Sequence, residues 1–307
     1  MRREERWRDS LSFSGERVQK IEAAFNPARS LRRSWAFLYR APVLLTVAGG
    51  ALVVLEAYAS YLRGGAEESV ALRLLERLPP LPMGLSMPRF SHLGVVQSWA
   101  AWIGPILLVL LAVRSRIEHL ALRAHGGIMR RGSAAPSRDD RGGGWGSLFL
   151  FHLLAFGVVT GSLLLAALPG ISVILLAGYT APGMAALGLL IAVGVALPVW
   201  LYVSMGLYLG GRFVVLEGHS PFEAIESSWN LARGARSALI VFRLTVGLFK
   251  AFALLVGLAL CGVGVFLTLP IARALAEAAL SEAFILAACE PEEGGWPLLG
   301  ELGETAT

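Results

Sequence analysis

Residues 146–168 read GSLFLFHLLAFGVVTGSLLLAAL, an almost entirely apolar segment that contains no Asp, Glu, Lys or Arg. The hydrocarbon core of a bilayer is about 30 Å thick, and about 20 helical residues cross it. Because lipid offers the backbone no hydrogen-bond partner, a single crossing segment satisfies its own amide groups by forming a helix. This segment therefore predicts a transmembrane helix.

Five more largely apolar segments of about this length occur along the 307-residue chain. Charged residues make up 16% of the chain, whereas a soluble domain carries about 25%. The mean hydropathy is +0.63. These features predict an all-α, polytopic transmembrane helical bundle of about six spans, at residues 42–62, 93–113, 146–168, 184–209, 238–259 and 265–288.

The Lys and Arg residues concentrate in alternate segments between these spans. Twenty of them fall in residues 1–41, 114–145 and 210–237, and four fall in residues 63–92. Cytoplasmic loops carry such an excess, so both termini are expected on the cytoplasmic side of a bacterial inner membrane. The clustering indicates membrane topology and argues against nucleic-acid binding.

The end of the chain leaves one alternative open. Leu254–Ile271 can form a single helix, followed by an amphipathic segment Arg273–Ala288 outside the membrane, which gives five spans and an external C-terminus. Cys261–Gly264 offers a tight turn, and Ala283–Ala288 is too apolar to expose to water. Six spans are therefore preferred.

The transmembrane domain, residues 42–288, is flanked by two segments of different character. Residues 289–307 form an acidic tail that is expected to be disordered. Residues 1–41 are basic and are expected to lie at the membrane interface. Two short helices are predicted there, the first with Val18, Ile21 and Phe25 on one face, the second with Ser30 as N-cap and with Trp35 and Tyr39.

Two GxxxG motifs occur in the predicted spans, Gly157–Gly161 and Gly206–Gly210. Glycines at this spacing let helix backbones approach closely. Packing within the bundle is the simpler interpretation, and dimerisation is the alternative.

The segment between the fourth and fifth spans predicts an amphipathic cytoplasmic helix whose two ends are both marked. A capping box and a proline at the first helical position mark its start, and a glycine past its last residue marks its end. Phe222, Ile225 and Trp229 share one face, which suits packing on the membrane surface or on the bundle. The motif comprises Glu217, Ser220, Pro221, Glu223, Trp229, Arg233 and Gly234.

The order of a span, Val-Leu-Glu-Gly, this short helix, Arg-Gly and a Gly-rich helical hairpin resembles the membrane domain of bacterial glycerophosphodiester phosphodiesterases. The resemblance covers roughly Gly146–Ala288, and the first two spans only in general layout. It implies a helical bacterial membrane domain without phosphodiesterase activity, because hydrolysis in that family belongs to a separate soluble barrel that this chain lacks.

Ionisable residues inside the predicted spans are the other functional candidate, because charges in lipid are costly and are usually paired or functional. If the last two helices form an antiparallel hairpin, Lys250 lies level with Arg273 and Glu277, and Arg243 lies level with Glu282. A contact between Lys250 and Glu277 is therefore predicted. The simpler interpretation is that these charges have a structural role, and the more specific one is that they form an ion path or an anion site. The candidate cluster comprises Arg243, Lys250, Arg273, Glu277 and Glu282, and Glu56 is a further charge in the first span.

Catalytic and metal-binding patterns are lacking in the sequence. It contains no HExxH, Walker A, GxSxG or CxxC motif, so no catalytic residue, metal or cofactor is predicted. His152 is expected to be a packed, hydrogen-bonded residue within the third span.

Three functional hypotheses remain. The preferred one is a non-enzymatic membrane module that organises lipid or a partner complex, with membrane lipids and a protein partner or second copy as its partners. The alternative is a transporter or permease for an ion or small anionic solute that uses the intramembrane charges. An intramembrane enzyme is third, because no nucleophile and base occur at a recognisable spacing.

Overall fold

A computed structural model describes residues 15–77, 93–131, 143–177, 182–260 and 264–288. These residues are almost entirely helical and contain no strand, so the predicted all-α fold class is confirmed for them. Several predicted features lie outside the described residues, namely residues 1–14, 132–142 of the cytoplasmic segment, 261–263 of the hairpin turn and the tail 289–307.

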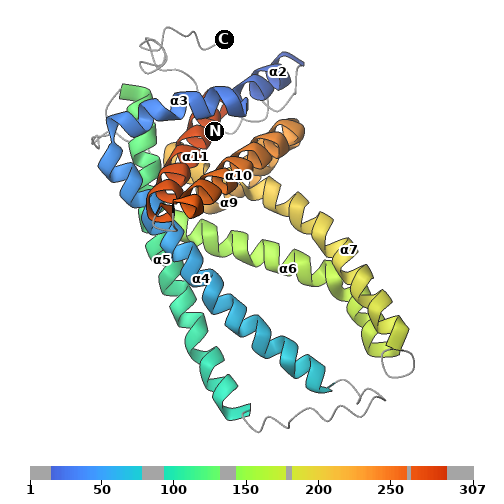
Figure 1. Cartoon of the computed structure of the whole chain (residues 1–307). Coiled ribbons are helices and arrows are strands. Elements are labelled where there is room, and N and C mark those ends of the chain that lie inside the picture. Colours follow the sequence, from blue (N-terminus) through green and yellow to red (C-terminus); the bar gives the residue numbers. More distant parts are fainter. Residues whose placement is uncertain (1–14, 78–92, 132–142, 178–181, 261–263, 289–307) are drawn as a thin grey trace. The chain divides into compact units, whose positions relative to one another are not determined.

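The helices begin close to the predicted positions, and three of the predicted spans start at the first residue of a helix. The helices are α2 (Gly15–Ala24), α3 (Pro27–Arg40), α4 (Pro42–Arg77), α5 (Leu93–Arg131), α6 (Trp145–Ala177), α7 (Pro182–Leu207), α8 (Gly210–Leu216), α9 (Pro221–Gly234), α10 (Arg236–Ala259) and α11 (Val265–Ala288) (Figure 1).

Four stretches of the described helices are long and apolar enough to cross a membrane: Pro42–Ser60, Trp145–Ile174, Ala186–Leu216 and Arg236–Ala259. Most of their large apolar side chains are exposed on the protein, which would be costly in water and is favourable in lipid. The chain thus has the features of a membrane protein. The predicted spans 93–113 and 265–288 are not among the four; α11 carries three charged residues, and residues 93–104 have no described side chains.

The chain divides into two compact units. Unit 1 comprises Met1–Val53, Arg114–Ala155 and Met205–Thr307, and unit 2 comprises Val54–Val113 and Phe156–Ser204.

In unit 2, glycines allow α6 and α7 to approach closely. A methyl group placed on Gly188 would lie 2.8 Å from the carbonyl oxygen of Gly170. Such a contact requires glycine, because any side chain would push the two backbones apart.

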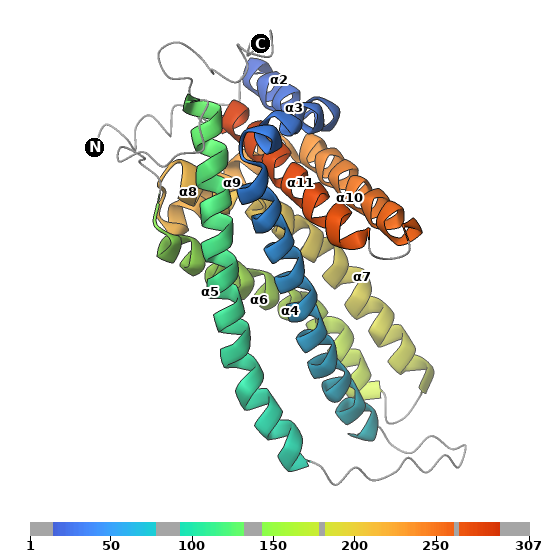
Figure 2. The same cartoon turned by 60° about the vertical axis from the view of Figure 1, so that its left-hand side comes forward.

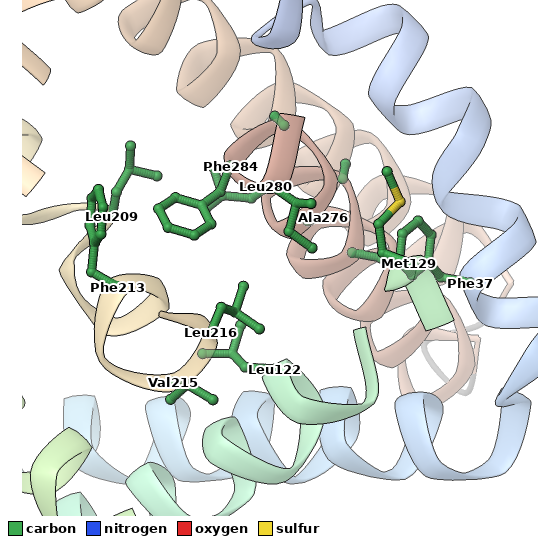
Figure 3. Packing of buried hydrophobic residues seen from close by; sticks show 14 of the residues in the cluster. Phe37, Leu122, Met129, Leu209, Phe213, Val215, Leu216, Ala276, Leu280 and Phe284 are labelled. Carbon is green, nitrogen blue, oxygen red and sulfur yellow. The ribbon is translucent and has the colours of Figure 1, made fainter. Parts of the chain in front are cut away.

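The core of unit 1 is built around α8, whose seven residues are all buried. Figure 3 shows Leu209 and Phe213 facing Phe284 of α11, and Leu216 beside Leu122 of α5. The rings of Phe213 and Phe284 meet edge to face, with their centroids 4.8 Å apart. The apolar run that extends past the predicted fourth span is therefore a core helix of unit 1.

The hairpin of α10 and α11 has the antiparallel pairing that was predicted. A methyl group on Gly257 would lie 2.7 Å from the Cα of Val265, so the two helices touch at the turn. Figures 1 and 2 both show α3 lying beside α11. Phe37 of α3 is completely buried and belongs to the core of unit 1.

The start of α3 differs from the prediction. Asn26 is the N-cap, its side chain accepting a hydrogen bond from the amide of Arg29, and Pro27 is the first helical residue. Ser30, the predicted cap, is buried within the helix. Because Pro is favoured at the first helical position, the Asn-Pro pair starts the helix four residues earlier. Ile21 and Phe25, predicted to share one face of the preceding helix, are both buried.

Candidate functional site

Unit 1 contains buried polar groups that connect helices far apart in the sequence. In the first of these groups, Nη1 of Arg33 on α3 donates a hydrogen bond to Oε1 of Glu282 on α11 at 2.8 Å. The two side chains are only 2% and 1% exposed. A buried charge is tolerated when it is paired and hydrogen-bonded. This ion pair therefore requires α3 and α11 to stay together.

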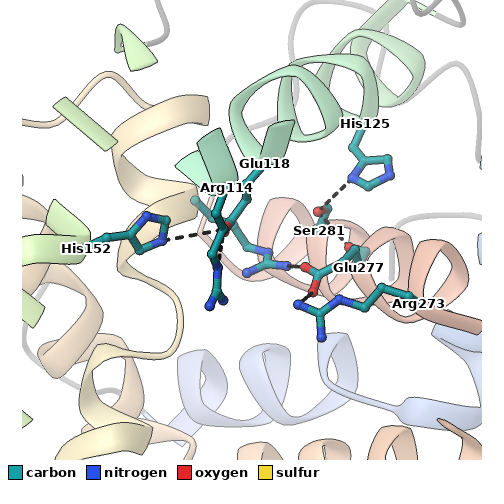
Figure 4. Close-up of polar contacts among 8 residues, drawn as sticks. Arg114, Glu118, His125, His152, Arg273, Glu277 and Ser281 are labelled. Atoms are coloured by element: carbon teal, nitrogen blue, oxygen red, sulfur yellow. Dashed lines mark hydrogen bonds and ion pairs between the residues drawn. The ribbon is translucent and has the colours of Figure 1, made fainter. Parts of the chain in front are cut away.

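The second group centres on Glu277 of α11. Its Oε2 accepts a hydrogen bond from Arg212 of α8 at 2.6 Å, and its Oε1 lies 3.2 Å from Nη2 of Arg273. Figure 4 shows the contact of Arg273 with this carboxylate. Lys250 of α10 acts electrostatically on the same carboxylate. The predicted contact between Lys250 and Glu277 stays a prediction.

Tyr208 and Arg243 extend this group. The guanidinium of Arg243 lies 5.2 Å from the centre of the Tyr208 ring, and its Nη1 is 3.8 Å from Sδ of Met205. The charges of Glu277, Arg212 and Arg273 act electrostatically on Tyr208. We call Tyr208, Arg212, Arg243, Lys250, Arg273 and Glu277 the Glu277 cluster.

The five charges predicted to form one cluster therefore separate into two. Arg273 and Glu277 are together, with Lys250 and Arg243 in the same cluster. Glu282 pairs with Arg33 of α3, and its predicted level beside Arg243 stays a prediction. The predicted hairpin of the last two helices gives only the position of each residue along the helix axis. It does not include α3, which supplies the partner of Glu282.

His125 connects the Glu277 cluster to a further helix, α5. Its Nδ1 lies 3.1 Å from Oγ of Ser281, and that hydroxyl donates its proton to the carbonyl oxygen of Glu277 at 2.8 Å. The hydroxyl proton is already used, so Nδ1 of His125 carries the proton and donates to Ser281. Burial lowers the pKa of His125 to about 4, with smaller effects from the charges of Glu277 and Arg212. The imidazole is therefore neutral near pH 7.

A further polar group joins α5 to α6. His152 lies with its Nδ1 2.9 Å from Oγ of Ser115 and its Nε2 3.5 Å from Glu118, and Arg114 is 3.9 Å from the same carboxylate (Figure 4). The prediction that His152 is packed and hydrogen-bonded is confirmed.

The helix between the fourth and fifth predicted spans, α9, begins as predicted. The hydroxyl of Ser220 accepts from the amide of Glu223, the Glu223 carboxylate accepts from the amide of Ser220, and Pro221 is the first helical residue. Its end differs, because Gly234 is the last residue of α9 and Ala235 is the C-cap. The positive φ of 72° falls instead on Gly218, ahead of the helix.

The remaining residues of the predicted α9 motif are distributed over several contacts. Glu217 forms an ion pair with Arg130 of α5 at 3.1 Å. Trp229 packs against Gly206, where an added methyl group would overlap its ring, and Phe222 is 69% exposed. Arg233 is exposed. The motif is thus a structural connection between α9 and its neighbours. Phe222 of α9, which is not part of the motif, is an exposed apolar side chain.

The sequence reasoning missed Arg212, Tyr208 and Arg33. A signal for the first two existed, because both lie within the 31-residue apolar stretch Ala186–Leu216, where a charged or polar group is notable. Arg33 had no such signal, since it is one of several arginines in a basic segment.

No family model matches this chain, and neither a curated protein nor a solved structure matches it. Within the described residues, no three His, Cys, Asp or Glu side chains are grouped so that they could hold a metal ion.

Proposed function

We propose that the protein is a non-enzymatic membrane module that organises anionic lipid at the inner surface of a bacterial cytoplasmic membrane. In this proposal it has six spans and both termini lie in the cytoplasm. The observation that carries the proposal is the exposed face of α3, and the membrane-domain resemblance is compatible with it.

One face of α3 packs on the protein and the opposite face is exposed. The packed face holds the buried side chains of Ser30, Arg33 and Phe37. The exposed face holds Arg32, Trp35 and Tyr39, with Trp35 56% and Tyr39 88% exposed. We call these three residues the α3 surface.

The composition and position of the α3 surface fit the headgroup layer of a bilayer. Trp and Tyr are enriched where membrane and water meet, because their rings are apolar and their polar atoms can stay wet. A guanidinium group binds the phosphate of an anionic lipid. The helix ends at Arg40, and the first candidate span begins at Pro42, so α3 is attached directly to a membrane-crossing helix.

The pairing of the buried charges supports a module over a catalyst. Two largely buried ion pairs, Arg33 with Glu282 and Arg212 with Glu277, join α3 and α8 to α11. Pairs of this kind act by holding helices in register.

Native mass spectrometry of the detergent-extracted protein tests this function. We expect the triple variant Arg32→Gln, Trp35→Ala, Tyr39→Ala to retain less phosphatidylglycerol than the wild type, with unchanged insertion and melting temperature. Arg116→Gln and Phe266→Ala are matched controls, because both side chains are exposed and lie outside the α3 surface. Equal lipid retention in the triple variant and the wild type would contradict the proposal.

A partner complex organised through α9 is a variant of the same function, and Phe222 is the residue to test. Replacing Phe222 should release a co-purifying protein without affecting insertion. Trp229 is unsuitable for this test, because it packs against Gly206 and its removal would disturb the fold.

The second candidate is a permease for an ion or small anionic solute, which the accumulation of cations around Glu277 favours. In that case Lys250→Met should leave the protein folded and abolish flux in proteoliposomes. Normal flux of the variant would exclude a permease that works through Lys250.

A further inference from the structure

One stripe of α3 is exposed along most of the helix. Its members recur at helical spacing: Ala28, Arg32, Trp35 and Tyr39. The helix carries four arginines and no acidic residue. The α3 surface is therefore both aromatic and cationic, and a complementary partner carries acidic and apolar side chains together.

Residues 289–307 of the same chain have that composition. They contain five glutamates and no Lys, Arg or Asp, and four large apolar residues lie among the glutamates. The glutamates are Glu290, Glu292, Glu293, Glu301 and Glu304, and the apolar residues are Trp296, Leu298, Leu299 and Leu302. The segment thus complements the α3 surface in charge and in apolar character.

The fold brings the start of this segment to α3. Both α2 and α3 contact α11, and the buried ion pair of Arg33 with Glu282 fixes α3 to α11 close to the end of α11. Residues 286–288 pack against the core of unit 1. The chain therefore continues into residues 289–307 from a fixed point beside α3.

The segment is long enough to reach the exposed side of α3. A helix with its side chains is about 10–12 Å across, so a path around half of it is roughly 20 Å long. An extended chain covers about 3.3 Å per residue, so about six residues span that path. Trp296 and the residues that follow it lie beyond this distance along the chain.

We infer that residues 289–307 bind the α3 surface of their own chain and compete there with anionic lipid. This inference rests on the proposed lipid function and adds a regulator to it. The glutamates of the segment pair with Arg32, and its apolar residues cover Trp35 and Tyr39.

The binding does not require strong contacts. Because the segment is tethered beside α3, its effective concentration at the α3 surface is on the order of millimolar. Arg32 has other interactions, but its side chain is exposed, and exposed ion pairs are weak enough to exchange. Anionic lipid at a high surface density can therefore displace the segment.

The first experiment tests the contact itself, with the full chain in a neutral detergent that contains no anionic lipid. Tyr39 is replaced by the photocrosslinker p-benzoylphenylalanine, and mass spectrometry identifies the cross-linked peptides. We expect intramolecular cross-links to residues 289–307 that decrease in the double variant Glu301→Gln, Glu304→Gln, at high salt and on addition of phosphatidylglycerol. The same photocrosslinker at Phe266, an exposed position at the opposite end of α11, should give no such cross-link.

The second experiment measures the affinity for phosphatidylglycerol by native mass spectrometry over a range of lipid concentrations. The double variant Glu301→Gln, Glu304→Gln should bind this lipid about twofold to fivefold more tightly than the wild type, because its competitor is weakened. Glu226→Gln, which removes an exposed carboxylate of α9, is the control for net charge and should bind as the wild type does. In the triple α3 variant, the two tail substitutions should have no effect.

The inference is overturned if position 39 cross-links only to a second chain, or to no residue of 289–307. An equal gain in lipid affinity in Glu226→Gln, or the same gain in the triple α3 background, overturns it as well, because the effect then comes from net charge. The proposed lipid function fails separately, when the wild type and the triple α3 variant bind phosphatidylglycerol equally; the cross-links do not depend on that result.

Discussion

A neutral imidazole connects α5 to α11. His125 donates from Nδ1 to Ser281, and burial lowers its pKa to about 4. In the unfolded chain the pKa of a histidine is about 6.5. The folded protein therefore resists protonation of a group that protonates readily once the chain unfolds.

The stability of the protein should depend on pH through His125. The stabilisation is fully present above pH 6.5 and is lost as the pH falls from 6.5 to about 4, because only the unfolded state binds the proton there. The loss amounts to roughly 3 kcal/mol. Unfolding in SDS mixed micelles at pH 7 and pH 4.5 measures it.

His125→Asn is the control for this pH dependence, because the amide can donate to Ser281 and does not titrate. The difference in unfolding free energy between wild type and variant should shrink at low pH. A pH-independent difference would contradict the assignment to His125.

The Arg33–Glu282 ion pair makes a second prediction for single residues. Arg33→Met should lower the unfolding free energy by about 1–3 kcal/mol, because the buried Glu282 side chain loses its hydrogen-bonded partner. The double variant Arg33→Met, Glu282→Leu should recover most of this loss. Arg32→Met, on the exposed face of α3, should cost less than about 1 kcal/mol, and an equal effect of both arginine replacements would refute the pairing argument.

Among the helices, the two GxxxG motifs have different surroundings. Gly206 lies against the ring of Trp229 and Gly210 against the ring of Phe151, whereas Gly157 and Gly161 have no atom within 4 Å of an added methyl group. Packing within the bundle is thus confirmed for the second motif. For the first motif, Gly157–Gly161, dimerisation stays a prediction.

Replacing the first glycine of each motif by alanine provides a matched comparison. Gly206→Ala should destabilise the protein by about 1–3 kcal/mol, since the methyl group overlaps Trp229. Gly157→Ala should be neutral or stabilising by up to about 1 kcal/mol, because alanine favours the helix and meets nothing. Melting temperatures in detergent measure both; a destabilising Gly157→Ala would indicate contact with a second copy.

For the whole molecule, the number of spans decides where the end of the chain lies. Six spans place Cys289 on the cytoplasmic side, as the predicted hairpin requires. In a Cys261→Ser background, a membrane-impermeant thiol reagent should label Cys289 in inside-out vesicles and leave it unlabelled in right-side-out vesicles. Labelling from the periplasmic side alone would establish five spans and remove the proposed topology.

The contacts that could be predicted are those between residues near one another in the sequence. Arg273 and Glu277 are four residues apart on one helix, so their pairing followed from helical spacing. The capping box of Ser220 and Glu223 followed for the same reason. Arg212 and Glu277 are 65 positions apart and Arg33 and Glu282 are 249 apart, and no local pattern relates them.

Local sequence was sufficient to locate the helices and to identify their affinity for lipid, because hydropathy and capping act over a few turns of one helix. Tertiary structure alone placed α8 in the core of unit 1 and α3 against α11. Those two placements give Glu277 and Glu282 their arginine partners. The physical reason is that a buried charge takes its partner from whichever helix packs beside it, and that packing depends on the side chains of all the helices together.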